Sequence, residues 1–181
     1  MKISDQGIAM IKEFEGLRLT TYKCAAGVKT IGYGHTGSDV YFGQRITERE
    51  AESLLRADLT RFERHVNSYD SAYGWTQNEF DALVSFAFNV GNIDGLTYNG
   101  IRSKKMIADK MLEYCKAGGK RISGLVARRQ REREMFLGVD NVDNSVDNSE
   151  ATLVRFLGVD NVDNSEATLV RDELHSLYRR D

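Results

Sequence analysis

Three polar residues near the N-terminus have the types and the spacing that acid–base chemistry requires. Glu15 stands directly before Gly16, where a helix is expected to end, while Cys24 falls at an expected hairpin turn and Thr30 on the returning strand. A hairpin folded over a helix end would bring the three side chains to one cleft. A carboxylic acid there can protonate a leaving group, and a hydroxyl or a thiol can hold a water molecule. Residues of these types at these spacings also occur by chance, and Glu15 alone could equally be a solvent-facing residue at a helix end. The hydrolysis of an acetal is one reaction that such a set could serve.

Cleavage of an acetal needs a proton on the departing oxygen and, with inversion, a water molecule on the opposite face of the sugar. The two protein groups then stand roughly 6.5 to 9.5 Å apart, which leaves room for the water. Glu15 is the natural acid, because Phe14, Leu17 and Ile31 can exclude water and favour a neutral carboxyl group. Cys24 would be a weaker base than an aspartate, since an ordinary thiol is mostly neutral at pH 7.

The local sequence predicts the helix and the hairpin that would position these groups. Apolar residues at helical spacing follow Ser4 and stop at Gly16, which predicts a first helix that ends at Glu15. Two β-prone segments, residues 19–22 and 28–31, flank an Ala-Ala-Gly turn and predict a hairpin. Glycines at positions 32, 34 and 37 then mark a loop.

Four further helices are predicted downstream. Thr47-x-x-Glu50 is a capping box that opens a helix to about residue 66, and Thr76-x-x-Glu79 opens a very apolar helix that should lie in the core. The other two cover residues 104–116 and a basic segment at 124–137, with a Gly-Gly break between them. A small N-terminal sheet followed by helices is an α+β fold.

The segment Thr30-Ile31-Gly32-Tyr33-Gly34-His35 completes a pattern that, with Glu15 and Cys24, resembles the active-site signature of phage-type lysozymes, the muramidase endolysins of glycoside hydrolase family 24. The resemblance continues through ITEREAESLL at residues 46–55, FDALVSFAFNVG at 80–91 and GLVARRQREREMFLG at 124–138. These segments keep the family's order, and together they cover residues 1–138. The tail beyond them resembles nothing in that family.

The resemblance implies a two-lobed fold with a small N-terminal β-hairpin lobe and a mainly helical C-terminal lobe, joined by the long helix that starts near Glu48. It implies hydrolysis of the β-1,4 bond between N-acetylmuramic acid and N-acetylglucosamine in peptidoglycan. The reaction would proceed with inversion and without a metal or cofactor. Glu15 would be the acid, and Thr30 and Cys24 would hold the water. Cys24 stands where many members have Asp. The supporting or substrate-binding residues that the resemblance implies are Gly34, His35, Leu96, Tyr98, Asn99, Arg128 and Arg129.

Two other interpretations stay open at the level of sequence. Cys24 and His35 can be a thiol–imidazole pair of a cell-wall peptidase or amidase, or the chain can be a catalytically inactive wall-binding module. His35 can equally be structural, anchored to an acidic partner or buried in the core, and Cys24 and Thr30 can be ordinary turn and strand residues. Arg128 or Arg129 is expected near Glu15, although alternating Arg and Glu also suits a helix face with ion pairs.

Composition bounds the class of protein. The chain has 181 residues, of which 41% are hydrophobic, so it can bury one core. It has neither an apolar run of about 18 residues nor a recognisable secretory signal, which predicts a cytoplasmic chain without stable membrane association. The resemblance implies a monomer that stays in the host cytoplasm until its release to the wall. The two cysteines match no metal-ligand spacing. Nucleic-acid binding is disfavoured, because the Arg run is short, lacks aromatic residues and belongs to a chain of pI about 6.0.

The sequence divides into a catalytic domain at residues 1–138 and an acidic tail at 139–181. The tail has ten Asp or Glu against four Arg, and the body 21 Lys or Arg against 17 Asp or Glu. Residues 136–145 recur word for word at 156–165, and 146–155 at 162–171, which indicates recent duplication or an artificial sequence, as does the absence of proline. The tail's Asp spacing does not fit a calcium loop. An amphipathic helix is expected near the C-terminus, with its apolar face formed by Leu169, Val170, Leu174, Leu177 and Tyr178.

Overall fold

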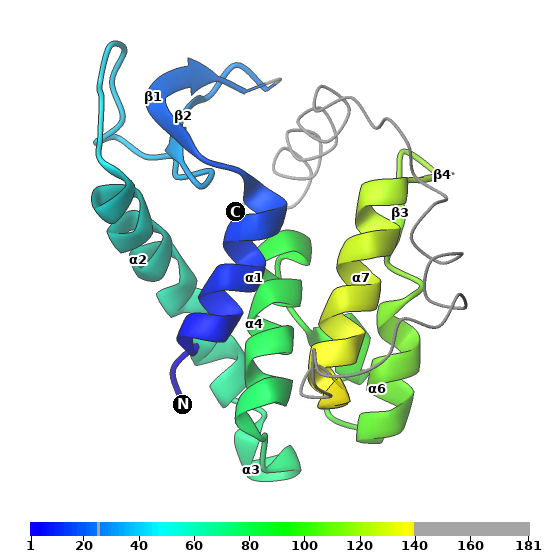
Figure 1. Cartoon of the computed structure of the whole chain (residues 1–181). Coiled ribbons are helices and arrows are strands. Elements are labelled where there is room, and N and C mark those ends of the chain that lie inside the picture. The colour runs from blue at the N-terminus through cyan, green and yellow to red at the C-terminus, as the bar shows by residue number, and fades with distance from the viewer. Residues whose placement is uncertain (25, 140–181) are drawn as a thin grey trace, which may run out of the picture.

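The computed structural model describes residues 1–24 and 26–139, which form a small β-hairpin lobe and a larger helical lobe (Figure 1). The elements follow the chain in the order α1 (Asp5–Glu15), β1 (Arg18–Lys23), β2 (Lys29–Gly32), α2 (Glu48–Asn67), α3 (Asp70–Tyr73), α4 (Gln77–Val90), α5 (Asp94–Thr97), α6 (Lys104–Met111), β3 (Lys116–Ala117), β4 (Lys120–Arg121) and α7 (Ser123–Phe136). The α+β prediction is confirmed. Within the described part of the chain the structure shows no helix long and apolar enough to cross a membrane.

Helix α1 begins and ends where its capping residues require. The Ser4 side chain accepts a hydrogen bond from the Gly7 amide, and Ser4 in turn is held by Asp81 of α4, which accepts from both its amide and its hydroxyl. At the other end, Gly16 has a φ of +65°, a conformation that glycine adopts without strain, and its amide donates to the Lys12 carbonyl. Glu15 is therefore the last residue of the helix, at the point where the chain turns into the hairpin.

Strands β1 and β2 form the predicted antiparallel hairpin. Tyr22 pairs with Thr30 and Lys23 with Lys29, while an irregularity between Arg18 and Tyr22 bends the first strand. The chain before α2 then returns along the free edge of β1, where the Thr21 amide donates to the Gln44 carbonyl at 3.1 Å. This third segment fixes the hairpin against the start of α2.

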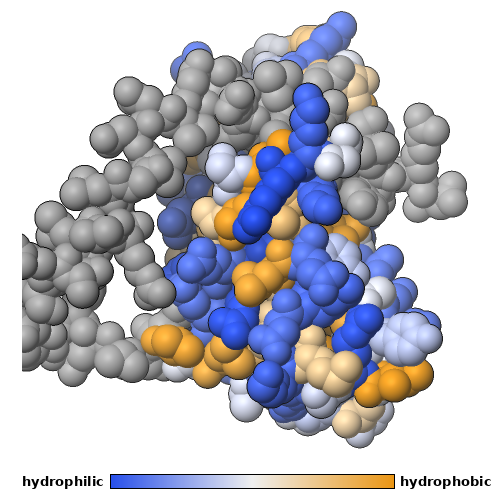
Figure 2. All heavy atoms as spheres, turned by 90° about the vertical axis from the view of Figure 1, so that its right-hand side faces the viewer, coloured by the Kyte–Doolittle hydropathy of each residue, from blue (hydrophilic) through white to orange (hydrophobic). Residues whose placement is uncertain are grey.

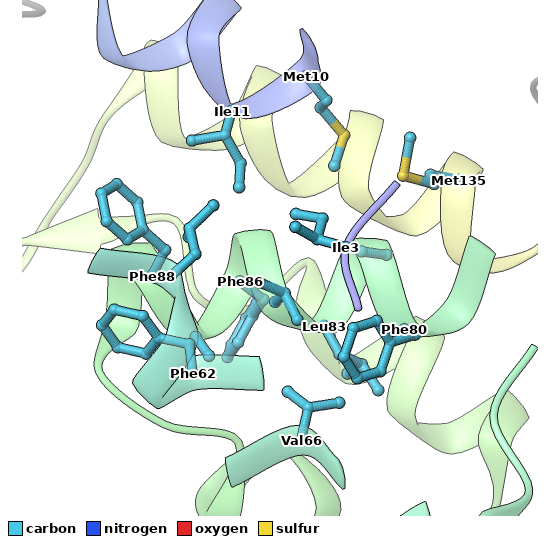
Figure 3. Packing of buried hydrophobic residues seen from close by; sticks show 14 of the residues in the cluster. Ile3, Met10, Ile11, Phe62, Val66, Phe80, Leu83, Phe86, Phe88 and Met135 are labelled. Carbon is cyan, nitrogen blue, oxygen red and sulfur yellow. The ribbon is translucent and has the colours of Figure 1, made fainter. Parts of the chain in front are cut away.

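Helix α4 is the centre of the core. Its N-terminus has the predicted capping box, in which Thr76 and Glu79 satisfy each other's backbone amides, and Thr47 and Glu50 do the same for α2. Figure 3 shows side chains of α4 packed with side chains of α1, α2 and α7 in one cluster. The members labelled there are Ile3, Met10, Ile11, Phe62, Val66, Phe80, Leu83, Phe86, Phe88 and Met135. Because α1 and α7 both pack on α4, this core fixes their relative position (Figure 1).

One predicted helix is shorter than expected. The helix predicted at residues 104–116 ends at Met111, and Lys116 already belongs to the hairpin of β3 and β4. The reason is packing between distant segments: Tyr114 turns inward against Phe86, with 4.9 Å between ring centroids, and Cys115 is buried. Gly118 and Gly119, both with positive φ, then make the tight turn of the hairpin. The short elements α3, α5, β3 and β4 were not predicted.

The outward side of α7 is polar. On the face of the molecule that carries α6 and α7, hydrophilic side chains predominate and hydrophobic groups are scattered among them (Figure 2). Arg133 contacts Asp109 of α6 at 3.1 Å, and Arg131 lies 3.9 Å from Glu134. The exposed charges of α7 thus form surface ion pairs, as the alternation of Arg and Glu predicted. Apart from Val139, the tail with its expected amphipathic helix lies outside the described residues.

Candidate active site

Glu15 is a buried carboxylate held by an arginine from the far end of the fold. Its side chain is 2% exposed, and Oε1 accepts a hydrogen bond of 2.7 Å from Nη1 of Arg128, which is 5% exposed. The two residues are 113 positions apart in the sequence, and they meet because α1 and α7 pack on α4. The guanidinium group also lies 5.5 Å from the centroid of the Phe14 ring. The sequence expected Arg128 or Arg129 near Glu15, and Arg128 makes the contact.

Arg128 is itself fixed by two further acceptors. Its Nε donates to Oε1 of Glu132 at 3.1 Å, and its Nη2 donates to the Ser85 carbonyl at 3.2 Å. Each of the three nitrogens of the guanidinium group therefore has a partner, in the fixed fork geometry of arginine. Burial opposes the charge of Arg128, but the two carboxylates outweigh it and raise the pKa of Arg128 above its usual value.

Arg129 and Glu132 complete the buried network. Arg129 lies 2.8 Å from Glu132 through its Nε, and its Nη2 donates to Glu132 Oε1 and to Asn89 Oδ1, both at 3.0 Å. Neither Arg129 nor Glu132 is exposed. Burial lowers the pKa of Arg129 to about 10, which still leaves it charged at neutral pH.

Sequence reasoning missed Glu132 and Ser85. A signal was present, because Arg128, Arg129 and Glu132 fall at helical spacing with the apolar residues Leu125 and Met135 and therefore share their face. Charged residues on the face that carries the apolar ones predict a buried ion network. That pattern was hidden by the alternation of exposed Arg and Glu along the same helix.

Cys24 and Thr30 lie on one face of the hairpin. The Val28 carbonyl accepts from the Cys24 amide at 3.0 Å and from Thr30 Oγ1 at 3.1 Å, so one group anchors both residues. Because Tyr22 pairs with Thr30, Cys24 and Thr30 are diagonal neighbours on the same side of the strands. Thr30 is buried and Cys24 half-buried with a free thiol. The hairpin starts three residues after Glu15, with Arg18 opposite Gly32 at its base.

Each ring nitrogen of His35 lies beside a carboxylate. Nδ1 lies 2.9 Å from Asp58 Oδ2 and Nε2 lies 3.1 Å from Asp39 Oδ2, and the contact with Asp58 is the main cause of a raised pKa for His35. An imidazole whose two nitrogens both face carboxylates favours its protonated form and cannot serve as the base of a thiol. The geometry therefore disfavours the peptidase interpretation. Gly34, with a φ of +94°, makes the turn that places His35 there.

The residues expected to line a saccharide groove differ in their exposure to solvent. Leu96 is 1% exposed and packs in the core, and its expected place beside a saccharide groove stays a prediction. Tyr98 and Asn99 are exposed, and both have positive φ, of 52° and 53°. Non-glycine residues in this region are uncommon, and such backbone often accompanies functional loops. A role for these two residues in binding stays a prediction.

The comparisons with known proteins agree with this geometry. The sequence profile of the phage lysozyme family, "Phage lysozyme", matches residues 12–132, a segment that contains the buried network and the hairpin. The chain belongs to the phage lysozyme family. In the described residues of this family member, no group of three or more His, Cys, Asp or Glu side chains converges as a metal site would require.

The relatives and solved structures that the chain resembles include proteins named endolysins and muramidases. The chain is 43% identical to the endolysin of Bacillus phage B103 over 157 residues, which are 83% of this chain and 59% of that endolysin. The muramidase domain of SpmX from Asticaccaulis excentricus is 37% identical, with a TM-score of 0.67 over 75% of this chain and 97% of that one. A P22 lysozyme mutant is 36% identical, with a TM-score of 0.64 over 76% and 99%. This chain spans about three fifths of the length of the Bacillus phage endolysins that it matches.

Proposed function

We propose that this phage lysozyme hydrolyses the β-1,4 bond between N-acetylmuramic acid and N-acetylglucosamine in bacterial peptidoglycan, with inversion and with Glu15 as the general acid. The observation that carries the proposal is the Glu15–Arg128 pair. It is a carboxyl group buried at a helix end, held by a guanidinium group from a distant helix, at the base of a hairpin that presents a thiol and a hydroxyl. The family of the chain and the titles of its relatives, endolysin and muramidase, support the same chemistry.

Arg128 has a role on the product side of the proton transfer. When neutral Glu15 gives its proton to the departing glycosidic oxygen, a carboxylate remains in a site that is almost closed to water. The Nη1–H of Arg128 is already aimed at Oε1, so the new charge is stabilised without any rearrangement. Because the pair is formed before the reaction, the direction of the carboxyl group is also fixed.

Thr30 and Cys24 would hold the attacking water. The Thr30 hydroxyl donates its own hydrogen to the Val28 carbonyl, so its lone pairs are left to accept a hydrogen from a water molecule. A water that donates to Thr30 turns a lone pair towards the sugar. Cys24, the diagonal neighbour of Thr30, supplies a weak donor or acceptor for the same water. In this proposal Cys24 positions the water and is not required to become a thiolate. The proton that the water loses when its oxygen bonds to the sugar carbon passes to bulk solvent, and Glu15 takes up a proton from solvent before the next turnover.

The proposed partner is the wall polymer alone. The Glu15 network is complete within one chain, which supports action as a monomer. The proposal places the protein in the cytoplasm of the host until it is released to the wall, which rests on the family resemblance.

The test is the variant Glu15→Gln, measured with a suspension of bacterial cell walls. The expected result is loss of clearing by a factor of about 100 or more, as for removal of a general acid, with binding to the walls retained. New reducing sugar ends must appear with the natural chain and no new amino groups, because amino groups would indicate a peptidase or amidase. A natural chain that binds walls without clearing them would instead be an inactive binding module, and the proposal would be wrong.

A further inference from the structure

Glu132 lies at the centre of the buried charge network. None of its hydrogen bonds or ion pairs within the described residues is to Glu15. Its carboxylate accepts from Ser85 Oγ at 2.7 Å, from Arg128 Nε at 3.1 Å and from Arg129 Nη2 at 3.0 Å. The side chain is 0% exposed. Arg128 and Arg129 thus share a single buried carboxylate in the contact between α4 and α7.

In the state with Glu15 ionised, after the proton transfer, the network is neutral only as a whole. Glu15 and Glu132 bring two negative charges, and Arg128 and Arg129 bring two positive ones. A buried charge without its counter-charge is strongly unfavourable, so each member depends on the others. Glu15 therefore faces one net positive neighbour, Arg128, only because Glu132 balances Arg129.

Glu132 also fixes the orientation of Arg128. A guanidinium group held only through Nη1 can turn about its side-chain bonds, which would move the hydrogen bond to Glu15. The hydrogen bonds from Nε to Glu132 and from Nη2 to the Ser85 carbonyl fix two of its three nitrogens. The third nitrogen, Nη1, is then directed at Glu15.

We propose that Glu132 is a positioning residue for the acid: it holds Arg128 in the orientation that binds Glu15, and its charge cancels that of Arg129 at the Glu15 carboxyl. This inference rests on the proposed function of Glu15. Glu132 does not touch the substrate in this proposal, and it acts only through Arg128 and through the field of the network.

The groups that surround the Glu15 carboxyl come from several elements. The titratable side chains that belong to the network or act on it are Glu15 of α1, Arg128, Arg129 and Glu132 of α7, and Cys115 before β3. Helix α4 contributes Ser85 and Asn89, which do not titrate. The two arginines and Glu132 are therefore the fixed charges that a substitution can unbalance.

The test uses three full-length variants whose effects differ in sign. Glu132→Gln removes a negative charge, favours the ionised form of Glu15, and should move the alkaline limb of the pH–kcat profile to lower pH by about one unit. At a fixed pH on the alkaline side of the limb this is about a tenfold loss of kcat, with KM changed less than about twofold. Arg129→Gln removes a positive charge and should move the limb to higher pH. The double variant restores neutrality and should return the limb to within about 0.3 units of the natural position.

Glu134→Gln is the matched control. It is the same chemical change two residues along α7, but the Glu134 side chain is 41% exposed and its described ion pair, with Arg131, is 3.9 Å long. Its pH profile should coincide with that of the natural chain. The midpoint of the Glu15 titration is measured in all variants by carbon-13 NMR of labelled glutamate, with Glu15→Gln to assign the signal. This readout needs no turnover and shows the effect even if the chain proves inactive on walls.

The outcomes separate the inference from the function it rests on. Opposite shifts in the two single variants, with recovery in the double, support the inference. Equal losses of kcat at every pH with an unchanged Glu15 titration mean that Glu132 is only structural, and the inference is wrong. If Glu132→Gln does not fold, the upward shift of Arg129→Gln and its reversal in the double variant carry the same decision. A natural chain without clearing activity refutes the function, while the NMR titrations still test the inference.

Discussion

The contact between His35 and Asp58 makes a sharp prediction about stability and pH. The Asp58 side chain is 22% exposed and that of His35 is 13% exposed, and the two lie 2.9 Å apart between the loop that follows β2 and helix α2. The hydrogen bond from Asp58, followed by its charge, raises the pKa of His35 against the opposing effect of burial. The folded protein therefore holds a proton on His35 more tightly than the unfolded chain does.

The magnitude follows from the type of contact. A hydrogen bond to a charged group contributes about 1.5–3 kcal/mol, and the upper part of this range applies while both His35 and Asp58 are charged. Once the imidazole is neutral and only Asp58 is charged, we expect the contribution to fall to the ordinary value of about 1 kcal/mol. Because the folded pKa of His35 is raised, the extra stability is fully present below the unfolded pKa of about 6.5 and is lost as the pH rises through the folded value. Asp58→Asn should therefore lower the free energy of unfolding by about 2–3 kcal/mol at pH 5.5 and by about 1 kcal/mol at pH 9.

The assay is denaturant unfolding of the natural chain and the variant at both pH values. Asp39→Asn is the control, because Asp39 also contacts His35 but its side chain is 62% exposed, so its loss should change the free energy of unfolding by less than about 1 kcal/mol. A destabilisation by Asp58→Asn that is the same at pH 5.5 and pH 9 would refute the reasoning, since it would show that the protonation of His35 is not linked to this contact.

Three further predictions concern the active site and the limits of the domain. Arg128→Lys keeps the charge but loses the fork, so we expect the free energy of unfolding to fall by about 2 kcal/mol and clearing activity to drop at least tenfold; unchanged activity would contradict the assigned role. Cys24→Ser should leave the products unchanged and reduce kcat less than about tenfold, as measured by reducing ends, whereas complete loss would mean that the thiol acts as base or nucleophile. Truncation after Gly138 should leave clearing activity intact, because the described core and the described residues of the buried network all precede that point; a folded but inactive fragment would show that the tail takes part.

The sequence was sufficient for the elements whose signals are local. Ser4, Gly16 and the two capping boxes define helix ends within four residues of the chain, and the structure has the helices that they predict. The hairpin of β3 and β4 could not be predicted this way, because strands of two residues have no periodicity. Its formation depends on Tyr114 packing against Phe86, a contact between distant segments.

The same contrast between local sequence signals and long-range packing applies to the candidate site. Glu15 and Thr30 could be selected because their places at a helix end and on a strand match the resemblance to phage-type lysozymes, and Arg128 or Arg129 because the basic helix belongs to the same resemblance. The choice between the two arginines could not be made from the sequence, because both share one helix face and only the packing of α1 against α4 brings one of them to Glu15. Likewise, an acidic partner for His35 was foreseen, but its identity as Asp58 depends on how α2 packs against the hairpin.

Ser85 connects the packed core to the buried charge network that holds Glu15. It lies at 0% exposure on α4, the helix at the centre of the core, and its carbonyl accepts from Arg128 while its hydroxyl donates to Glu132. A buried network of this kind is often no more stable than an apolar core of the same volume. What it supplies is orientation: the core fixes α4, α4 fixes Arg128 through Ser85, and Arg128 fixes Glu15. A change in the core that shifts α4 should therefore reduce activity before it unfolds the protein.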